Sequence, residues 1–539
     1  MANSLLELDL GPNARTSAYA DDFVVLVTGP NAYVISRRAT QALGKMERWA
    51  ESQKLQFSAA KTSAVFYLKP HDDGLGRAPR APPRIRFKGL PVKTVKTQNY
   101  LGITIDEKLN GMAHVANIRA KMARYTLAIN SLSRRDWGLS GEILKLLYKR
   151  GLERIAAYAC GSWWTGTATM REKLNSAQRL ALVAITRCFR TTSTVALQVL
   201  AGCLPLDLQI ELEFNMAQLR RFRKVATFGD TKIFHSEVQY PLSRWANHPA
   251  KAPAIDWVEG HPNNRGIEVF TDGSRIDGNV GSGEAIYADG QLLEEDSFRL
   301  SSEATVFQAE LVAIMKSLEM VNSCDINATE DIKLYSDSMS SLQALSNSSS
   351  TVPLIATIHA RRAGKRIRWF WVKAHIGTVG NERADFLAKR GTKHLGIDYP
   401  VKLSFRSCKS RLHKEAVKLW QTRWDESDKG RQVHRFLPRV SEQRSWTSPH
   451  VNWLVTGHGP FPAYFRRFNL RRSRGVCHIC NSPKADGIHF VVFCPGTETI
   501  RTQLCPRLSP ATLSSYLRVK EGRKALGKLC KQVQCQFPL

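Results

Sequence analysis

Two aspartates end apolar stretches in the central part of the chain. Asp272 follows Ile267–Thr271 and Asp337 follows Ile332–Ser336, and each is followed by a small residue. Apolar stretches of this length predict buried strands. A carboxylate that ends a strand lies at the rim of a sheet, where small neighbours leave room for a ligand. Taken alone, each position is equally consistent with an ordinary strand-terminating aspartate.

A third carboxylate falls on a predicted helix. Glu310 lies on or beside an apolar stripe at helical spacing, which consists of Phe307, Leu311, Ile314 and Leu318. A carboxylate that faces a core is unfavourable unless a positive charge compensates it. Glu310 is therefore either the partner of a cation or a glutamate at the edge of the stripe.

An aspartate and a histidine follow the next predicted strand. This strand begins at Arg368 and runs into a glycine-containing loop that carries His375. Asp385 comes in the first turns of the following helix, which Asn381 could cap. A histidine on a loop suits proton transfer or product release, although a plain surface histidine has the same local pattern.

These acidic residues could bind divalent cations if the fold brings their side chains together. Four crowded carboxylates, at Asp272, Glu310, Asp337 and Asp385, would repel one another unless cations bridge them. Hard oxygen ligands select Mg²⁺ or Mn²⁺ over zinc. In a two-metal site, one ion generates the attacking hydroxide and the other stabilises the leaving 3′ oxygen of a phosphodiester. We therefore predict a two-metal phosphodiesterase site.

The order of these stretches resembles the type 1 ribonuclease H family, in the version attached to reverse transcriptases of non-LTR retrotransposons. The matching strings are Phe270–Ser274 (FTDGS), Gln308–Leu311 (QAEL), Tyr335–Ser338 (YSDS), Val372–His375 (VKAH) and Gly380–Asp385 (GNERAD). The resemblance implies a five-stranded mixed sheet flanked by helices. It also implies endonucleolytic cleavage of the RNA strand of an RNA–DNA hybrid, which leaves 5′-phosphate and 3′-hydroxyl ends.

A basic run lies just before the strand that leads to His375. Its members are Arg361, Arg362, Lys365 and Arg366. Recognition of a hybrid needs contacts to 2′-hydroxyls on one strand and to a DNA backbone on the other. The run is therefore a candidate phosphate contact, and a solvated basic surface is an equally consistent interpretation.

Adjacent aspartates near the N-terminus, Asp21 and Asp22, lie between apolar segments. At the turn of a hairpin such a pair can coordinate Mg²⁺, although Asp-Asp turns are common. The pair forms part of a string that resembles the catalytic turn of reverse transcriptases, and two later strings resemble the next palm motif and the primer-grip hairpin. In order, these strings are Tyr19–Asp22 (YADD), Leu55–Thr62 (LQFSAAKT), whose Lys61 is a candidate proton donor, and Tyr100–Asp106 (YLGITID).

The chain departs from the reverse transcriptase pattern before this turn. The family needs a further metal-binding aspartate on an earlier strand, and fingers that hold the template and the nucleotide. Eighteen residues precede Tyr19, which we expect to be too few for either. We therefore predict no DNA synthesis by this chain alone. A reverse transcriptase subunit completed by another chain is the alternative.

A cysteine cluster near the C-terminus has the spacing of a zinc knuckle. Cys477, Cys480, His489 and Cys494 offer three thiolates and one imidazole, a closed set that favours structural Zn²⁺. His478 is a rival ligand that we rank lower because it adjoins Cys477. Unliganded reduced cysteines are the alternative. The flanking basic residues suit phosphate contact, and they are Arg471, Arg472 and Arg474. Similar clusters lie near the C-terminal end of non-LTR retrotransposon polyproteins.

Composition agrees with a nucleic-acid partner. The formal net charge is +31, and hydrophobic residues make up 43% of the 539 residues. An excess of this size favours a polyanion, because Lys and Arg release counterions from phosphates. We expect no membrane partner, because no apolar run approaches the length of a membrane span. Eleven cysteines without a secretion signal predict an intracellular, reducing compartment, nuclear or cytoplasmic. The sequence does not identify a protein partner.

The pattern along the chain predicts a multidomain α+β and α/β protein. We expect a partial reverse-transcriptase palm, a helical thumb, a ribonuclease H-like sheet domain and a small zinc knuckle. We expect the last forty residues to be basic and weakly ordered. The predicted regions are 1–110 (palm), 111–248 (thumb), 249–263 (linker), 264–395 (ribonuclease H), 396–470 (basic helices), 471–500 (knuckle) and 501–539 (tail).

The leading hypothesis is therefore a ribonuclease H within a truncated retrotransposon polyprotein. Its expected cofactors are two Mg²⁺ or Mn²⁺ ions and one structural Zn²⁺, and its expected partner is nucleic acid, either an RNA–DNA hybrid or the element RNA. A non-catalytic nucleic-acid-binding remnant is the alternative from another class. Intact acidic residues at all four positions favour the enzyme.

Overall fold

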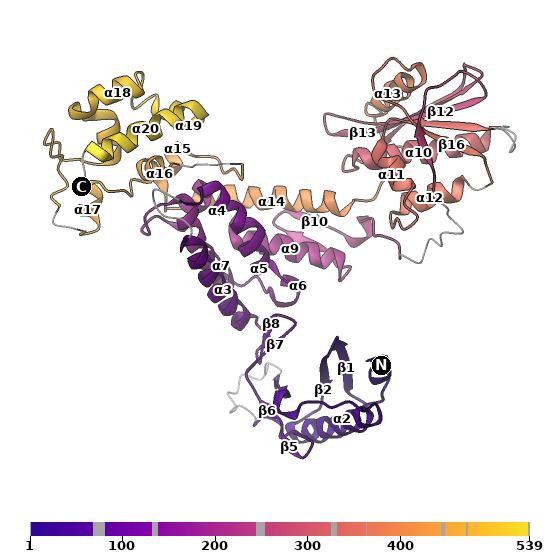
Figure 1. Ribbon diagram of the computed structural model, residues 1–539, viewed down its shortest axis with the longest axis horizontal. Coiled ribbons are helices and arrows are strands. Elements are labelled where there is room, and N and C mark those ends of the chain that lie inside the picture. The colour runs from indigo at the N-terminus through magenta and orange to yellow at the C-terminus, as the bar shows by residue number, and fades with distance from the viewer. Residues whose placement is uncertain are drawn as a thin grey trace. The chain divides into compact units, whose positions relative to one another are not determined.

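The computed structural model describes residues 2–67, 81–131, 138–243, 254–324, 331–362, 364–443, 448–470 and 473–536 (Figure 1). The chain divides into two compact units. The first comprises Met1–Glu211 and Trp420–Leu539, and the second comprises Leu212–Leu419.

A mixed sheet forms the centre of the second unit. Its strands are β11 (Trp257–Glu259), β12 (Ile267–Ile276), β13 (Asn279–Ala288), β14 (Gln291–Leu300), β15 (Ile332–Ser336) and β16 (Ile367–Trp371). Their order is β11-β16-β15-β12-β13-β14. The β12–β15, β15–β16 and β11–β16 pairs are parallel, and the β12–β13 and β13–β14 pairs are antiparallel.

The expected strand count and linker both need correction. The sheet has six strands rather than five, because β11 pairs with β16 along Trp257–Glu259. This strand lies inside the stretch 249–263, which the sequence predicts to be a linker. An edge strand of three residues makes most of its contacts with a distant part of the chain, so its own sequence carries little periodic signal.

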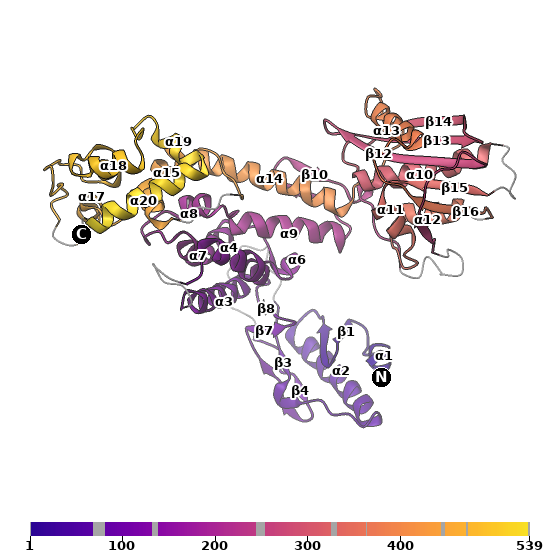
Figure 2. The ribbon, with the colours of Figure 1, turned by 45° about the horizontal axis from the view of Figure 1, so that its top comes forward.

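Helices cover both faces of this sheet, and they are α10 (Val306–Ser323), α11 (Met339–Leu345), α12 (Pro353–Arg361) and α13 (Val379–Gly391). Ser282 Oγ donates to the carbonyl of Ala309 in α10, whereas a Cβ on Gly283 would lie 2.3 Å from the Ala388 nitrogen of α13. Successive strand residues point to opposite faces. Helices α10 and α13 therefore lie on opposite faces of the sheet (Figure 2).

Each face of the sheet has its own apolar core. The larger core, beneath α10, α11 and α12, includes Val269, Leu311 and Ile355. The smaller core beneath α13 is aromatic, and in it the ring of Tyr335 stacks between Phe270 and Phe370 at centroid distances of 4.9 and 5.0 Å. This double covering buries β15, which ends just before Asp337, and the part of β12 that leads to Asp272.

The second unit also contains a short hairpin of β9 (Ala226–Phe228) and β10 (Thr231–Ile233), and the 3₁₀ turn η3 (His235–Glu237). Helices α9 (Leu206–Arg220) and α14 (Phe405–Glu426) contribute residues to both units.

The N-terminal region of the first unit combines short strands with one long helix. Its elements are α1 (Ala2–Leu6), β1 (Ala14–Tyr19), β2 (Asp22–Val27), α2 (Ala32–Ser52), η1 (Ala59–Lys61), β3 (Ser63–Ala64), β4 (Arg86–Phe87), β5 (Leu90–Pro91), β6 (Lys93–Thr94), β7 (Thr97–Tyr100) and β8 (Ile103–Asp106). Helix α2 begins at Ala32, where the Asn31 side chain accepts from the Val34 N–H and caps the helix. Ala42 and Met46 of α2 pack with Leu5 and Leu10 in a small core.

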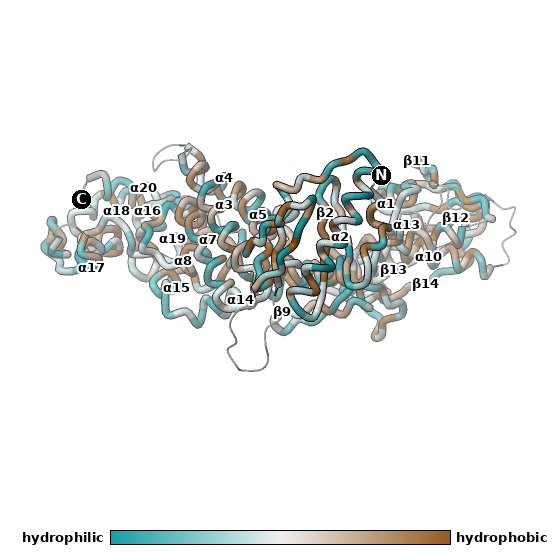
Figure 3. Tube along the Cα trace, turned by 90° about the horizontal axis from the view of Figure 1, so that it is seen from below, coloured by the Kyte–Doolittle hydropathy of each residue, from teal (hydrophilic) through white to brown (hydrophobic). Residues whose placement is uncertain are grey.

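A helical region follows, as predicted. Its elements are α3 (Met112–Ser131), α4 (Gly141–Leu147), the π-helix η2 (Tyr148–Leu152), α5 (Glu153–Ala157), α6 (Cys160–Trp163), α7 (Ala168–Thr186) and α8 (Thr194–Ala201). Apolar and polar residues alternate along the traces of its helices (Figure 3). Across the described residues, no single helix is long and apolar enough to cross a membrane. The bent pair Thr194–Ala201 and Leu206–Phe222 meets that test jointly, by length and composition only.

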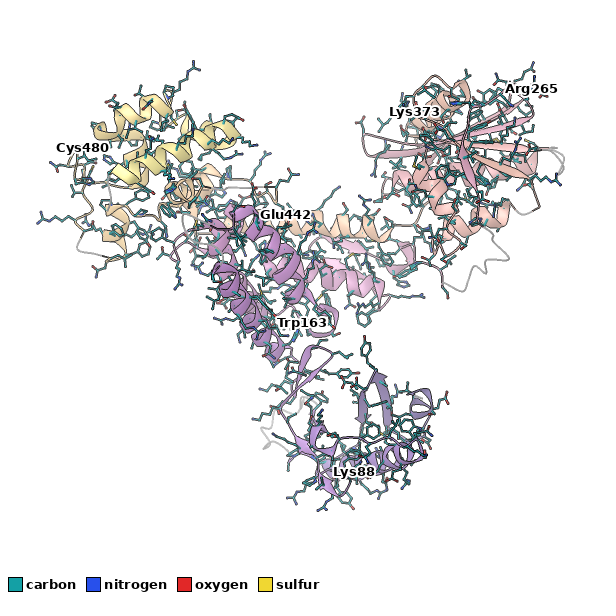
Figure 4. The ribbon with its side chains drawn as sticks, viewed as in Figure 1. Lys88, Trp163, Arg265, Lys373, Glu442 and Cys480 are labelled. Carbon is teal, nitrogen blue, oxygen red and sulfur yellow. The ribbon has the colours of Figure 1, made fainter. Side chains whose placement is uncertain are left out.

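The C-terminal region is helical to residue 536. Its elements are α15 (Arg431–Phe436), α16 (Pro449–Thr456), α17 (Pro462–Arg467), the π-helix η4 (His489–Phe493), η5 (Pro495–Thr497), α18 (Glu498–Leu504), α19 (Leu513–Arg518) and α20 (Lys520–Gln536). The Lys149 ammonium binds the carboxylate of Glu442, labelled in Figure 4, at 2.8 Å. The expectation that the final forty residues are weakly ordered is wrong, because Leu526 and Leu529 of α20 are fully buried.

Candidate functional site

The parallel pairing of β12 with β15 places two acids side by side. Thr271 pairs with Ser336 at the end of this ladder, so Asp272 and Asp337 each come one residue after the last β12–β15 pair. Strand β12 itself continues to Ile276, and Asp272 pairs with Gly283 of β13, so the expectation that Asp272 ends a strand is wrong. Asp272 is 7% exposed and Asp337 is half-buried. Both carboxylates therefore lie at the end of the β12–β15 ladder.

A glycine allows the third acid to approach. A Cβ on Gly273 would lie 2.6 Å from the backbone nitrogen of Glu310 and 2.9 Å from the Ala309 Cβ. Helix α10 can rest this closely on β12 only because residue 273 has no side chain. The Gly273 backbone also hydrogen-bonds to the carboxylates of Asp272 and Glu310.

The start of α10 fixes the height of Glu310 along the sheet. The Thr305 hydroxyl accepts from the Gln308 N–H at 3.2 Å, and the Gln308 side chain accepts from the Thr305 N–H at 3.0 Å. This capping box sets the first turn of the helix. It holds Glu310 one turn inside the helix, at the level of Asp272.

The three carboxylates share one small volume. Ligand oxygens of Asp272, Glu310 and Asp337 all lie within 4.8 Å of one another. Burial, reinforced by the charges of Asp337 and Asp385, raises the pKa of Asp272 to about 7. Burial and the nearby Asp272 and Asp337 hold the pKa of Glu310 well above its usual range. Without a cation, the cluster thus favours partial protonation.

Asp385 belongs to an adjoining group on α13 and the loop before it. Its carboxylate lies within 4.8 Å of ligand atoms of His375 and Glu382. It is close enough to Asp272 and Asp337 that its charge raises the pKa of each, although burial is the larger cause for both. The structure therefore brings three of the four acids into one cluster and sets the fourth beside it.

The sequence analysis did not single out Glu382 as a site residue. It precedes Asp385 by three residues, so both side chains lie on one face of α13. Spacing along a predicted helix was the signal that could have identified it. The exposed loop that carries His375 places this residue at a positive φ of 55°.

Neighbouring side chains orient the acids. Asn381 Nδ2 donates to Asp337 Oδ2 at 3.4 Å, and the Trp371 indole donates to the Asp337 carbonyl at 3.1 Å. The Lys389 ammonium lies 2.6 Å from Asp385 Oδ2, one turn along α13. Lys389 therefore occupies one oxygen of Asp385 that a cation would otherwise use.

The donor set fits hard divalent cations. The three clustered ligands are carboxylates, and the buried Glu310 Oε2 atom has no hydrogen-bond partner in the part of the chain that the structure describes. An orphaned carboxylate oxygen that faces other carboxylates is stable only when a cation or proton shares it. Mg²⁺ and Mn²⁺ prefer such oxygen ligands.

The family model described as RNase H matches residues 263–393, the stretch that contains strands β12–β16 of this sheet and all four acids. A ribonuclease H of Alcanivorax borkumensis is 32% identical over 146 residues, which cover 24% of this chain and 91% of that protein. The chain belongs to the ribonuclease H family.

Relatives of this ribonuclease H chain also occur in retrotransposons. A 115 kDa protein in the type-1 retrotransposable element R1DM of Drosophila melanogaster is 32% identical over 214 residues, 39% of this chain and 20% of that protein. A retrovirus-related Pol polyprotein from the type-1 retrotransposable element R1 of Nasonia vitripennis is 30% identical over 212 residues, 38% of this chain and 61% of that protein. The chain is thus homologous to these polyproteins and spans about one to three fifths of their lengths.

The predicted basic run of the ribonuclease H domain is partly engaged in structural contacts. An ion pair joins Arg361 to Glu319, and Lys365 Nζ donates to the Val321 carbonyl at 3.4 Å. Arg362 is half-buried, and Arg366 is exposed. These contacts anchor the run to the end of α10. The Lys373 side chain, labelled in Figure 4, lies instead on the loop before His375 and is exposed.

The C-terminal cysteines and histidine form a compact cluster. Ligand atoms of Cys477, Cys480, His489 and Cys494 lie within 4.8 Å of one another. The Cys477 and Cys494 sulfurs are 3.9 Å apart, and Cys480 Sγ lies 3.4 Å from His489 Nε2. Figure 4 labels Cys480 within this region. Soft sulfur and nitrogen donors in a closed set of four fit zinc.

Local turns build this cluster. Asn481 adopts a left-handed φ of 54°, and its N–H donates to the Cys477 carbonyl, which closes a turn around Cys480. The Asp486 carboxylate accepts from the His489 N–H at 2.7 Å and starts η4. The four-residue group does not include His478, whose ring centroid is 6.3 Å from that of Phe490. Arg474 is exposed; Arg471 and Arg472 lie outside the described residues.

The adjacent aspartates near the N-terminus lie at a hairpin turn. Tyr19 of β1 pairs with Asp22 of β2, and Ala20 has a positive φ of 53°. Asp21 and Asp22 are exposed, and so is Lys61 at the end of η1. In the described part of the chain, none of the three joins a group of metal-ligating side chains.

Proposed function

We propose that the ribonuclease H domain of this chain cuts the RNA strand of RNA–DNA hybrids internally, using two divalent cations held by Asp272, Glu310, Asp337 and Asp385. The observation that carries this proposal is the cluster of three carboxylates, two buried and one half-buried, in which one Glu310 oxygen has no hydrogen-bond partner among the described residues. Family membership supports a hydrolase of the ribonuclease H class.

Cations bound there would supply Lewis-acid activation of the scissile phosphate and of the attacking water. The protein positions their ligands. Gly273 lets Glu310 meet Asp272, and its backbone hydrogen-bonds to both carboxylates. Asn381 donates to Oδ2 of Asp337 and so restrains this carboxylate.

Proton transfer would be carried out by the group that adjoins the cluster, which consists of His375, Glu382 and Asp385. His375 lies on an exposed loop within 4.8 Å of Asp385 and Glu382, so it can accept a proton at the site and release it to solvent. We assign His375 the role of proton carrier, with Asp385 and Glu382 as its acidic neighbours.

Hybrid cleavage with matched variants tests the proposal. Purified chain, a labelled RNA–DNA hybrid and Mg²⁺ are expected to give short RNA products with 5′-phosphate and 3′-hydroxyl ends. Asp337→Asn is expected to bind the hybrid without cutting it. Asp277→Asn, an exposed turn residue of the same domain, is expected to cut normally. Equal binding without cutting by the wild-type chain would favour the alternative, a non-catalytic binder.

We propose that Cys477, Cys480, His489 and Cys494 hold one structural zinc ion. The proposal rests on the donor set and on the turns at Asn481 and Asp486, which bring the four side chains together. The zinc would stabilise the fold of residues 471–500, because a cluster of this size has little apolar core of its own.

We propose that residues 1–110 and 111–248 correspond to parts of a reverse transcriptase palm and thumb, with residues 264–395 as the nuclease domain. The hairpin that carries Asp21 and Asp22 at its turn supports this assignment. Because no further carboxylate joins these two among the described residues, we expect no polymerase activity without a complementing chain. Primer extension by the purified protein would refute this.

A further inference from the structure

Helix α20 carries a row of four lysines. Lys520, Lys524, Lys528 and Lys531 are all exposed. At 3.6 residues per turn, these positions fall within about 80° of one another around the helix axis. At 1.5 Å per residue, the row is about 16 Å long. The lysines therefore form one continuous basic face.

The opposite face of α20 anchors the helix. Leu526, Leu529, Cys530 and Val533 are at most 3% exposed, and they pack α20 against α16, α18 and α19, as Figure 1 shows for α18 and α19. Arg523 Nη1 donates to the carbonyls of Leu517 and Arg518 at 3.1 and 2.9 Å, which fixes the junction with α19. The lysine row is thus held on a packed helix.

The positive charge of the row is not neutralised by ion pairs. Within the described ranges, none of the four lysines has an acidic partner. Residues 448–470 and 473–536 contain twelve Lys and Arg against three Asp and Glu. Glu521 is the acidic residue of α20, and it lies at the edge of the row. Such a surface favours a polyanion.

We propose that the outward face of α20 binds the sugar–phosphate backbone of nucleic acid without regard to sequence. Four ammonium groups at spacings of one helical turn can each meet a phosphate along a strand. Lysine offers a point charge rather than the planar fork with which arginine reads guanine. The row therefore contributes binding affinity but does not discriminate between base sequences. This surface is separate from the nuclease residues and does not depend on the function proposed for them.

Salt-dependent binding tests this proposal. Full-length chain, purified with zinc, is titrated with a fluorescent 20-nucleotide single-stranded DNA across a KCl series without Mg²⁺. Each phosphate contact to a single strand contributes about 0.7 to the slope of log K against log salt. Changing all four lysines to Gln is therefore expected to make the slope shallower by about 3. Affinity at 0.1 M KCl is expected to fall about tenfold or more.

Two further variants separate placement from total charge. A matched variant changes four exposed lysines elsewhere, Lys224, Lys402, Lys414 and Lys429, to Gln and is expected to keep the wild-type slope. A variant with Arg at the four α20 positions keeps the charge and is expected to keep both slope and affinity. If the quadruple Gln variant loses its helical circular dichroism signal, the single Lys524→Gln variant tests the proposal instead. Its slope of log K against log salt is expected to be shallower by about 0.7.

The remaining outcomes overturn the proposal. An unchanged slope in the α20 Gln variant would do so, and so would an equal loss in the matched variant. Vesicles of phosphatidylcholine with phosphatidylserine form a second arm. Lysine-dependent binding to these vesicles, with DNA binding unchanged, would show that the row is a membrane surface instead.

Discussion

Gly273 lies in close contact with helix α10 in the nuclease site, and Gly273→Ala tests whether this contact sets the geometry of the acids. The added Cβ would lie 2.6 Å from the Glu310 nitrogen and 3.0 Å from the Ala309 carbonyl carbon. Carbon and nitrogen atoms rest at about 3.5–4.0 Å. These are backbone atoms of α10, so relief requires that the helix move away from β12 by about 1 Å.

That displacement predicts a larger loss of activity than of stability. Overpacking of this kind costs about 1–3 kcal/mol, which corresponds to a fall of roughly 5–10 °C in the unfolding midpoint of a domain this size. Misplacement of a catalytic group by about 1 Å lowers the rate about 100-fold. We therefore expect Gly273→Ala to be folded at 20 °C but nearly inactive on hybrid.

Hybrid cleavage rates and thermal unfolding measured on the same samples check this prediction. Gly396→Ala is the matched control, because a Cβ there meets no atom within 4 Å. If Gly273→Ala cleaved within twofold of wild type with an unchanged midpoint, the close approach of α10 would not govern the site.

Three further predictions concern the pH dependence caused by Asp272, the competition between Lys389 and Mg²⁺ for Asp385, and the zinc cluster. Because the folded pKa of Asp272, about 7, exceeds its ordinary value of 3.8, the folded state holds this proton more tightly than the unfolded state. In magnesium-free buffer, the Asp272 contribution to the free energy of unfolding is thus lost as pH rises from about 4 to 7. Asp272→Asn should flatten this dependence in thermal melts; an equally steep profile would contradict the assignment. Lys389→Met should lower the Mg²⁺ concentration for half-maximal cleavage about two- to fivefold, because an exposed ion pair worth about 0.5–1 kcal/mol no longer competes for Asp385. Lys393→Met serves as its control, and equal shifts in both variants would refute the competition. Cys480→Ser should release zinc and expose α18–α20 to protease, measured by a zinc-release assay and limited proteolysis beside Cys324→Ser. Retained zinc, or zinc loss with unchanged protection, would contradict the structural role.

The nuclease fold was the most predictable part of the molecule. Asp337 directly follows an apolar strand, as its local pattern predicts. Asp272 lies inside β12 instead of at its end, because β12 continues to pair with β13 as far as Ile276. The parallel register of β12 and β15, which brings them together, is a long-range property that the sequence does not state directly. Glu310 was identified by its position beside an apolar stripe, which works because an amphipathic helix shows its buried face in its spacing.

Strand β11, the C-terminal helices and the contacts of the basic run could not be predicted, because they depend on residues that are distant in the sequence. Strand β11 forms because Trp257–Glu259 meets the free edge of β16, more than a hundred residues away. The sequence of the C-terminal residues resembles a basic tail, since Lys and Arg far outnumber Asp and Glu in it. These residues fold because the apolar face of α20 packs against α16, α18 and α19. Arg361 and Lys365 looked available for phosphate, yet Glu319 and a carbonyl of α10 engage them.

Manganese binding followed by electron paramagnetic resonance tests the central claim most directly, because it reports ion capture by the carboxylate cluster without any assay of cleavage. We predict that the wild-type chain binds Mn²⁺ in competition with Mg²⁺, and that Glu310→Gln, which removes the orphaned carboxylate at the centre of the cluster, weakens this binding about tenfold or more. Indistinguishable Mn²⁺ titrations of the two proteins would contradict the account.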